Sequence, residues 1–366
     1  MQSIQASPLV VRNPLRSPLT SAAAAVLAFA TSLAAPGAAS AQGAAAAPSS
    51  CSPVGDLSFV CGLTNVEDFL PVDGGRWLVG GSFKEGSAGL YLVDTAAKMA
   101  KAVTLAIAAK PDPIYAGCQA PDLKKLATHG LDVKTGPAGT TTVYAVNHGG
   151  HEAIEVFRLT ASKGSAEWIG CVEMPANTST NSVAALSGGG FVATKFLDTS
   201  DKKAFQTILA GKVNGTVYRW TPGKGLSEVP GSQFSGDNGI AVSADDKWVY
   251  VNAYGTNEIY KLPLSGSGQK AVAKVDFHPD NLRWTPDGKL FVTGQFLSSP
   301  NSPTPPPGKH TDWATVRLDP ATMAVTPVVK EAGLAEFEGA TSCVQVGKTL
   351  WFGTYRGDRM AYRAAP

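Results

Sequence analysis

The sequence predicts an all-β fold, a six-bladed β-propeller with a metal site in its central channel. Strand patterns follow one another from Leu57 to Tyr362 with almost no amphipathic helix, and clusters of Gly, Pro, Asn and Asp separate them. One short unit also recurs six times along the chain. Propellers often exceed the usual size of one domain, and the turn signals are evenly scattered. We therefore expect residues 61–366 to form a single propeller domain.

The recurring unit is clearest in DNGIAVSADDKWVYVN, residues 237–252. A polar pair precedes a short strand with β-branched residues, the turn residues Asp245 and Asp246 follow, and a second strand returns. Equivalent units begin at residues 67, 129, 181, 238, 280 and 341, an average spacing of about one four-stranded blade. Because the first strand of each blade lines the channel, the polar residues at these strand starts should converge on the propeller axis.

The converging residues mostly carry oxygen atoms suited to a hard cation. An Asn or Asp before a strand often only bonds the neighbouring backbone, so no single position identifies a site. Two carboxylates and three amides at one point, however, match the ligands that calcium prefers. The predicted calcium ligands are Glu67, Asn181, Asn238, Asp280 and Asn281.

Two histidines are the candidate catalytic residues. His129 begins one strand and His148 ends the strand expected to pair with it, so hairpin geometry brings the two close together. One imidazole can take a proton from water while the other orients it or relays the proton. His151 and His278 are the competing candidates. No GxSxG motif supports a serine nucleophile.

The first 60 residues read as a targeting segment and a spacer. Arg12 and Arg16 precede a mostly apolar run at residues 21–35, and small residues suited to cleavage end at Ala41. The run is short and alanine-rich for a membrane anchor. We expect residues 1–41 to be a cleaved signal peptide, residues 42–60 to be a flexible leader, and the exported protein to be periplasmic or secreted, without membrane attachment.

Charge and cysteine content narrow the partners and the disulfides. Without residues 1–41 the chain has 29 Lys+Arg and 29 Asp+Glu, since only two of its 31 basic residues lie there. With no basic stripe, a nucleic-acid partner is not expected. Five cysteines in an oxidising compartment leave at least one unpaired within the chain. Cys51 with Cys61 is the most plausible disulfide, Cys118 with Cys171 is a further candidate, and Cys343 reads as a buried thiol.

Six segments, taken in their order along the chain, resemble the calcium-dependent paraoxonase/arylesterase family and, more distantly, the gluconolactonase group. The segments are NVEDFLPVDGG, ATHGLDV, VYAVNHGG…EAIEVFRL, TNSVAALSGGGFVAT, DNGIAVSADDKWVYV and PDNLRWTPDGKLFV, within a resemblance that extends from about Cys61 to Tyr362. The resemblance implies a six-bladed propeller with calcium in the channel. It places the calcium ligands on the five oxygen-bearing residues above and the histidine pair on His129 and His148.

Two departures from the family pattern carry expectations of their own. Asp68 matches a ligand of the family's second, structural calcium, but Ser182 stands where the other acidic ligand would follow Asn181. A second ion near Asp68 is therefore doubtful, and either no ion or water in its place is expected. The chain ends MAYRAAP without cysteine, so the family's terminal disulfide cannot form. We expect strand pairing between the two chain ends to close the ring.

The sequence supports two functions of different classes. The first is a calcium-dependent hydrolase of lactones or aryl esters, in which His129 activates water with the help of His148, and Asp280 is the alternative base or nucleophile. The second is a non-catalytic scaffold whose calcium ion only ties the blades together. A histidine pair open to solvent beside the ion favours the enzyme. Its partner would then be a small lactone or ester. An apolar rim is expected from Phe196, Phe234, Tyr254 and Phe296, although core packing explains such residues equally well.

Overall fold

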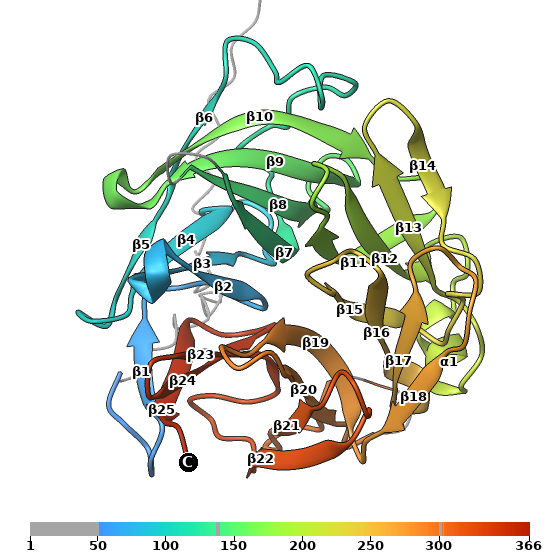
Figure 1. Cartoon of the computed structure of the whole chain (residues 1–366). Helices are drawn as coiled ribbons and strands as arrows, with labels where there is room; N and C mark the ends of the chain where they lie inside the picture. Colours follow the sequence, from blue (N-terminus) through green and yellow to red (C-terminus); the bar gives the residue numbers. More distant parts are fainter. Residues whose placement is uncertain (1–50, 137–139, 300–301, 303) are drawn as a thin grey trace, which may run out of the picture. The chain divides into compact units, whose positions relative to one another are not determined.

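In a computed structural model of the chain, six β-sheets stand in a ring around a central axis (Figure 1). The structure describes residues 51–136, 140–299, 302 and 304–366. Within these residues the sheets confirm the predicted six-bladed β-propeller. The predicted signal peptide, residues 1–41, and the first part of the predicted leader, residues 42–50, lie outside the described residues.

The first three blades use strands from the N-terminal half of the chain. The first blade consists of β2 (Phe69–Val72), β3 (Trp77–Gly81), β4 (Leu90–Asp94) and β5 (Met99–Ala102). The second consists of β7 (Thr128–Thr135), β8 (Thr141–Asn147), β9 (Ala153–Thr160), β10 (Ser165–Glu173) and β6 (Thr104–Ile107). The third consists of β11 (Thr178–Ala185), β12 (Phe191–Asp198), β13 (Thr216–Thr221) and β14 (Gly225–Glu228).

The other three blades complete the ring. The fourth consists of β15 (Asp237–Val242), β16 (Trp248–Ala253), β17 (Glu258–Pro263) and β18 (Ala271–Lys274). The fifth consists of β19 (His278–Trp284), β20 (Leu290–Phe296), β21 (Asp312–Leu318) and β22 (Val325–Glu331). The sixth consists of β23 (Ala340–Val346), β24 (Thr349–Thr354), β25 (Arg359–Ala364) and β1 (Ser58–Cys61).

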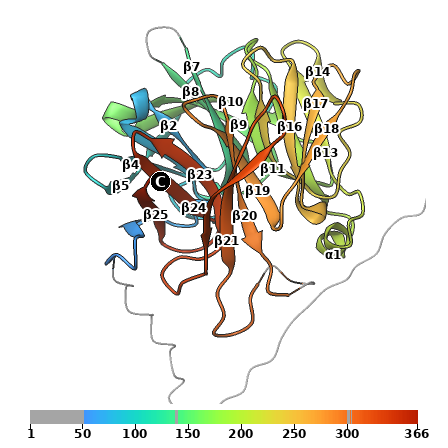
Figure 2. The same ribbon diagram turned by 60° about the horizontal axis from the view of Figure 1, so that its bottom comes forward.

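Helical structure is sparse and lies in the connections. Among the described residues, 3-10 turns form at η1 (Asp73–Gly75), η3 (Ala161–Lys163) and η4 (Tyr254–Thr256). One α-helix, α1 (Ala204–Leu209), follows β12, and the strand patterns of the sequence did not predict it. Figure 2 shows α1 at one face of the ring. Among the described residues, none of the helices has the length and apolar character needed to cross a lipid bilayer.

The two ends of the described chain meet in the sixth blade. Strand β1 pairs antiparallel with β25, with Ser58 opposite Tyr362 and Cys61 opposite Arg359 (Figure 1). This pairing confirms that strands from the two chain ends close the ring. Residues 58–60, expected to belong to a flexible leader, are thus part of a strand, because β25 offers them an open edge to pair with.

The hydrophobic core is divided into layers between neighbouring blades. Val79 of the first blade packs in one cluster with Leu131 and Trp168 of the second blade. Leu78, also of the first blade, packs in another cluster with Trp351 of the sixth blade. The remaining clusters bridge the other pairs of adjacent blades in the same way. Apolar side chains therefore fill the spaces between blades and leave the axis of the ring to polar residues.

Two disulfides form in the described chain. Cys51 pairs with Cys61, and Cys118 pairs with Cys171, as the sequence suggested. Cys343 is a buried free thiol.

Candidate active site

The innermost strands share an irregularity that points side chains at the axis. In five of the six, the pairing register with the next strand shifts at an equivalent place. The shifts fall between Thr128 and Leu131, Thr180 and Val183, Asp237 and Ile240, Pro279 and Leu282, and Ala340 and Ser342. The intervals contain six predicted or repeat positions, namely His129, Asn181, Asn238, Asp280, Asn281 and Thr341. Because a β-bulge leaves residues unpaired and redirects their side chains, the repeated polar unit corresponds to a repeated bulge.

Two glycines let these bulged strands approach one another. A Cβ atom at Gly239 would lie 2.3 Å from the carbonyl oxygen of Asp280 on the neighbouring innermost strand. At Gly130 it would lie 2.4 Å from the carbonyl oxygen of Asn181. The strands can therefore come close only where the residue after the site position has no side chain.

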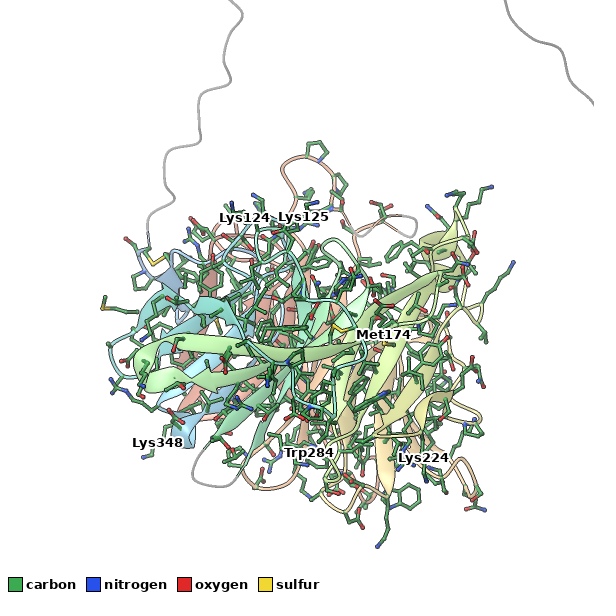
Figure 3. The ribbon with its side chains drawn as sticks, turned by 90° about the horizontal axis from the view of Figure 1, so that it is seen from above. Lys124, Lys125, Met174, Lys224, Trp284 and Lys348 are labelled. Carbon is green, nitrogen blue, oxygen red and sulfur yellow. A yellow bond between two sulfur atoms is a disulfide. The ribbon has the colours of Figure 1, made fainter. Side chains whose placement is uncertain are left out.

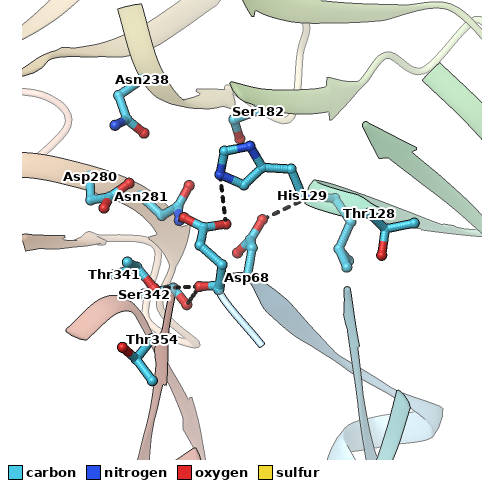
Figure 4. A network of polar contacts seen from close by, with 12 residues as sticks. Asp68, Thr128, His129, Ser182, Asn238, Asp280, Asn281, Thr341, Ser342 and Thr354 are labelled. Carbon is cyan, nitrogen blue, oxygen red and sulfur yellow. Dashed lines mark hydrogen bonds and ion pairs between the residues drawn. The ribbon is translucent and has the colours of Figure 1, made fainter. Parts of the chain in front are cut away.

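The predicted site residues surround one cavity of about 270 Å³. Six of the seven line it directly, namely Glu67, His129, His148, Asn181, Asn238 and Asp280. The seventh, Asn281, donates from Nδ2 to Oε1 of Glu67 at 2.5 Å. Figure 4 shows His129, Asn238, Asp280 and Asn281 directed toward a common space. The structure thus brings together residues that are up to 214 positions apart in the chain.

Four of the five predicted calcium ligands present a buried oxygen atom that accepts no hydrogen bond. These atoms are Oε2 of Glu67 and the Oδ1 atoms of Asn181, Asn238 and Asn281. A buried oxygen without a partner costs free energy, because it has lost its hydrogen bonds to water. Four such atoms around one point, all of them oxygen, match the donor set of a hard cation. The residues present therefore fit a calcium ion.

Burial disfavours the ionised form of both carboxylates at this point. Burial raises the pKa of Asp280 to about 7, although Nε2 of Gln295 donates to its Oδ2 at 2.7 Å. Burial, and then the charge of Asp280, raise the pKa of Glu67 well above its ordinary value. A cation between the carboxylates would offset both effects, because opposite charge favours the ionised form.

The backbone of Glu67 is held by the sixth blade. Its carbonyl oxygen accepts hydrogen bonds from Oγ1 of Thr341 at 2.5 Å and from Oγ of Ser342 at 2.7 Å (Figure 4). Thr341 is the sixth member of the sequence repeat. It thus acts on the site by positioning Glu67.

The two candidate histidines are in direct contact. Nδ1 of His129 lies 3.0 Å from Nε2 of His148, and Nε2 of His129 lies 3.6 Å from Oε2 of Glu67. The Phe83 ring stacks on His129 with 4.1 Å between ring centroids. Burial, together with the nearby His148, lowers the pKa of His129 well below its ordinary value. His129 is therefore neutral at neutral pH and able to accept a proton.

A carboxylate that the sequence did not single out completes this chain of contacts. Oε2 of Glu152 lies 2.8 Å from Nδ1 of His148, and Oε1 of Glu152 accepts the backbone N–H of Thr180 at 2.5 Å. Glu152 precedes β9, whereas Thr180 lies on β11 of the next blade. Only the packing of two blades brings them together.

The competing histidines have other roles. His151 contacts the buried carboxylate of Glu155 at 2.7 Å, which raises the pKa of its imidazole. His278 contacts the carbonyl oxygen of Tyr254 at 2.7 Å. Neither is among the residues that line the cavity.

An arginine contacts the residue matched to a second calcium. The Arg283 guanidinium, buried in the channel, donates from Nε to Oδ1 of Asp68 at 2.9 Å and from Nη2 to Oδ2 of the same carboxylate. It also donates to the carbonyl oxygens of Leu131 at 3.0 Å and Leu282 at 2.7 Å. The oxygen atoms around Asp68 therefore already face a positive charge supplied by the chain.

This arginine also borders a second cavity, of about 250 Å³. Arg283, Trp284 and Asp132 are among the residues that line it. In Figure 3, which views the ring from its edge, Trp284 lies opposite Lys124 and Lys125. Asp132 accepts the backbone N–H groups of Val133 at 2.8 Å and Ala185 at 2.7 Å, and burial raises its pKa to about 6.

Aromatic and aliphatic side chains form the walls of the first cavity. They are Phe83, Phe196, Leu197, Phe205, Tyr254, Leu297 and Tyr355. Of the four residues expected at an apolar rim, Phe196 and Tyr254 lie there. Phe234 instead stacks on Tyr260, and Phe296 packs against Phe277. Phe205 comes from α1, which the sequence did not predict.

Comparison with known proteins identifies relatives in sequence and in fold. The arylesterase family profile matches residues 81–358, more than half of the chain. Serum paraoxonase/arylesterase 2 of Homo sapiens and of Canis lupus familiaris are each 28% identical to it over 195 residues. These matches cover 50% of this chain and 54% of each relative, so the chain spans about half the length of the curated relatives it matches.

Two solved structures share the fold at low sequence identity. A luciferin-regenerating enzyme is 13% identical, with a TM-score of 0.52, and the match covers 84% of this chain and 92% of that one. A gluconolactonase from Xanthomonas campestris is 15% identical, with a TM-score of 0.51, and the match covers 85% and 89%. With a family match across most of the propeller, this chain belongs to the arylesterase family.

Proposed function

We propose that the protein is a calcium-dependent hydrolase of lactones or aryl esters. The observation that carries the proposal is that a pair of contacting histidines lines the same cavity as three residues that carry a buried oxygen atom without a partner, namely Glu67, Asn181 and Asn238. A fourth such oxygen belongs to Asn281, which is bonded to Glu67. Membership of the arylesterase family supports hydrolysis of an ester bond. The apolar walls of the cavity suit a substrate with an aromatic or aliphatic part.

Calcium would be held by oxygen atoms of five residues. These are Glu67, Asn181, Asn238, Asp280 and Asn281, of which two are carboxylates that offset the charge of a divalent cation. When bound, calcium supplies positive charge that stabilises the negative charge developing on the carbonyl oxygen of the substrate. The chain's own residues supply the proton transfers.

His129 is the proposed general base. Its Nε2 atom accepts a proton from water while the water oxygen forms a bond to the carbonyl carbon of the substrate. The bond between that carbon and the leaving oxygen then breaks, and the proton passes from His129 to the leaving oxygen. A lactone gives a hydroxy acid, and an aryl ester gives a carboxylic acid and a phenol. His148 holds the His129 ring through the contact at Nδ1.

The openness of the histidines supports an enzyme over a scaffold. The side chains of His129 and His148 are 12% and 20% exposed, and both line the cavity. An ion that only tied the blades together would require no such opening. Export through a signal peptide at residues 1–41 is part of the proposal and rests on the sequence alone.

A hydrolysis screen tests the proposal. Purified protein is assayed with lactones, aryl esters and phosphotriesters, each with calcium and with a chelator. We expect turnover of at least one lactone or aryl ester that the chelator abolishes and added calcium restores. Calcium binding without turnover of any substrate would favour the non-catalytic scaffold. Turnover that the chelator does not change would show that the reaction does not depend on calcium.

A further inference from the structure

We propose that Glu152 is a positioning residue that sets the tautomers of both site histidines, so that the basic nitrogen of His129 faces the channel. The four groups form a chain of contacts from Glu152 to His148, His129 and Glu67, at 2.8, 3.0 and 3.6 Å. The catalytic consequence of this arrangement rests on the proposed function, but the tautomers themselves do not.

The direction of the hydrogen bonds in this series of contacts follows from which atoms carry a proton to donate. Oε1 of Glu152 accepts the N–H of Thr180, and an ionised carboxylate can only accept at Oε2 as well. Nδ1 of His148 must therefore carry the proton in the contact with Glu152. In a neutral ring Nε2 of His148 is then an acceptor, so Nδ1 of His129 must donate to it. The proton-free nitrogen of His129 is consequently Nε2, which lies on the side of Glu67.

The neighbours of the histidine rings keep this arrangement in place. Phe83 stacks on the ring of His129 and meets the ring of His148 edge-on, with 5.5 Å between centroids. The backbone N–H of His148 donates to the carbonyl oxygen of Ala127, and this bond holds His148 beside the start of β7. Rotation of either ring would therefore break a packing contact as well as a hydrogen bond.

An isosteric substitution at Glu152 should reverse the direction of the hydrogen bonds between Glu152, His148 and His129. In Glu152→Gln, the N–H of Thr180 still requires an acceptor, so the amide oxygen takes the place of Oε1 and the amide nitrogen faces His148. Nδ1 of His148 must then accept, its Nε2 must donate to His129, and Nε2 of His129 becomes protonated. A base with its proton already in place cannot take one from water. In a serine protease triad, an Asp-to-Asn change at the orienting carboxylate lowers kcat about 10⁴-fold through such a wrong tautomer.

The test compares Glu152→Gln with Glu152→Ala. Alanine removes the orienting group but lets water satisfy His148 in either tautomer, so we expect it to lower kcat by about tenfold. Glutamine should lower kcat by about 10²-fold or more, with KM unchanged, although it melts closer to wild type than alanine because it keeps the bond to Thr180. The exposed Glu173→Gln removes a charge from the end of β10 and serves as the control, with kcat unchanged.

A purely structural Glu152 would give the opposite order, with glutamine active and alanine impaired, and that result would overturn the proposal. A second readout needs no substrate. Long-range ¹H–¹⁵N spectra of the histidine rings should show His148 protonated at Nδ1 in wild type and at Nε2 in Glu152→Gln. A wild-type His148 protonated at Nε2, or at both nitrogens, would also overturn it. If the expected tautomers are seen but no substrate is cleaved, only the proposed hydrolase function fails.

Discussion

At the scale of single residues, the site depends on side chains whose protonation is set by burial. His129 lies against Phe83 and His148, and its burial keeps the imidazole neutral by lowering its pKa. Glu67 and Asp280 are buried as well, but for a carboxyl group burial raises the pKa. Burial therefore keeps His129 in the neutral form that a base requires. It also makes the ionised forms of two nearby carboxylates unfavourable unless a cation binds between them.

Replacing His129 tests the proposed base. His129→Gln keeps a polar side chain of similar size but cannot accept a proton from water, so kcat should fall by about 10²-fold or more. Calcium content and the melting temperature should stay close to wild type, because His129 is not one of the proposed ligands. His310→Gln, outside the cavity lining, is the matched control. Full turnover by His129→Gln would move the role of base to Asp280.

Asp132, which lines the second cavity, gives a prediction about pH. The unfolded chain releases the proton of this carboxyl near the ordinary pKa of about 3.9, whereas the folded chain releases it at about 6. Between these values the folded state binds more protons, so this group's contribution to stability falls as pH rises. The unfolding free energy of wild type minus that of Asp132→Asn should therefore decrease from pH 4 to pH 6. Denaturant titrations measure it, and a pH-independent difference would contradict it. Asp276→Asn, at an exposed carboxylate, is the control.

At the scale of the strands, the site depends on the bulges of the innermost strands. A regular strand would pair every residue and alternate its side chains between two faces. The bulges instead leave a polar residue of each strand facing the axis, and the glycines that follow His129 and Asn238 let adjacent strands come close. The arrangement of the proposed calcium ligands on β11, β15 and β19 thus depends on backbone irregularity.

Adding a methyl group at Gly239 tests the close approach of β15 and β19. Its Cβ atom would overlap the carbonyl oxygen of Asp280, so Gly239→Ala should separate the strands. We expect a loss of about 1–3 kcal/mol in unfolding free energy and weaker calcium binding. Gly188→Ala, where nothing lies within 4 Å of the added atom, should change stability by less than about 0.5 kcal/mol. Calorimetry with and without calcium measures both quantities, and equal effects of the two substitutions would refute the argument.

At the scale of the whole molecule, contacts on the axis join blades that are far apart in the chain. Glu67 of the first blade is bonded to Asn281 of the fifth and, through its carbonyl oxygen, to Thr341 of the sixth. Arg283 of the fifth blade reaches Asp68 of the first and Leu131 of the second. Together with the pairing of β1 and β25, these contacts hold the ring closed from its centre and from its edge.

Calcium should therefore stabilise the fold as well as permit turnover. A ligand that binds only the folded state at about 100 times its Kd adds about 2.7 kcal/mol of stability. Chelation should lower the melting temperature, and Glu67→Gln or Asp280→Asn should weaken calcium binding, whereas Glu173→Gln should not. Equilibrium dialysis should give one ion per chain, because Arg283 already supplies the positive charge beside Asp68. An unchanged melting temperature together with no bound metal would contradict the calcium site, and two ions per chain would contradict the role of Arg283.

Much of the fold and part of the site could be predicted from residues close in sequence. The polar unit at the start of each inner strand repeats with the blade, so the number of blades and the residues that converge on the axis follow from local pattern. The helix α1 escaped prediction, since six residues are too few for a periodic signal. Glu152 escaped it because its partner Thr180 belongs to another blade.

The sequence by itself determined that the chain forms six blades and that oxygen-bearing side chains meet at their centre, because strand alternation and turn chemistry are local properties. Only the tertiary structure decided which partner each polar group finds. Arg283 reads as an ordinary strand residue, yet its guanidinium donates to a carboxylate 215 positions away. Hydrogen bonds and ion pairs act over a few ångströms, so the packing of blades decides which groups are close enough to form them.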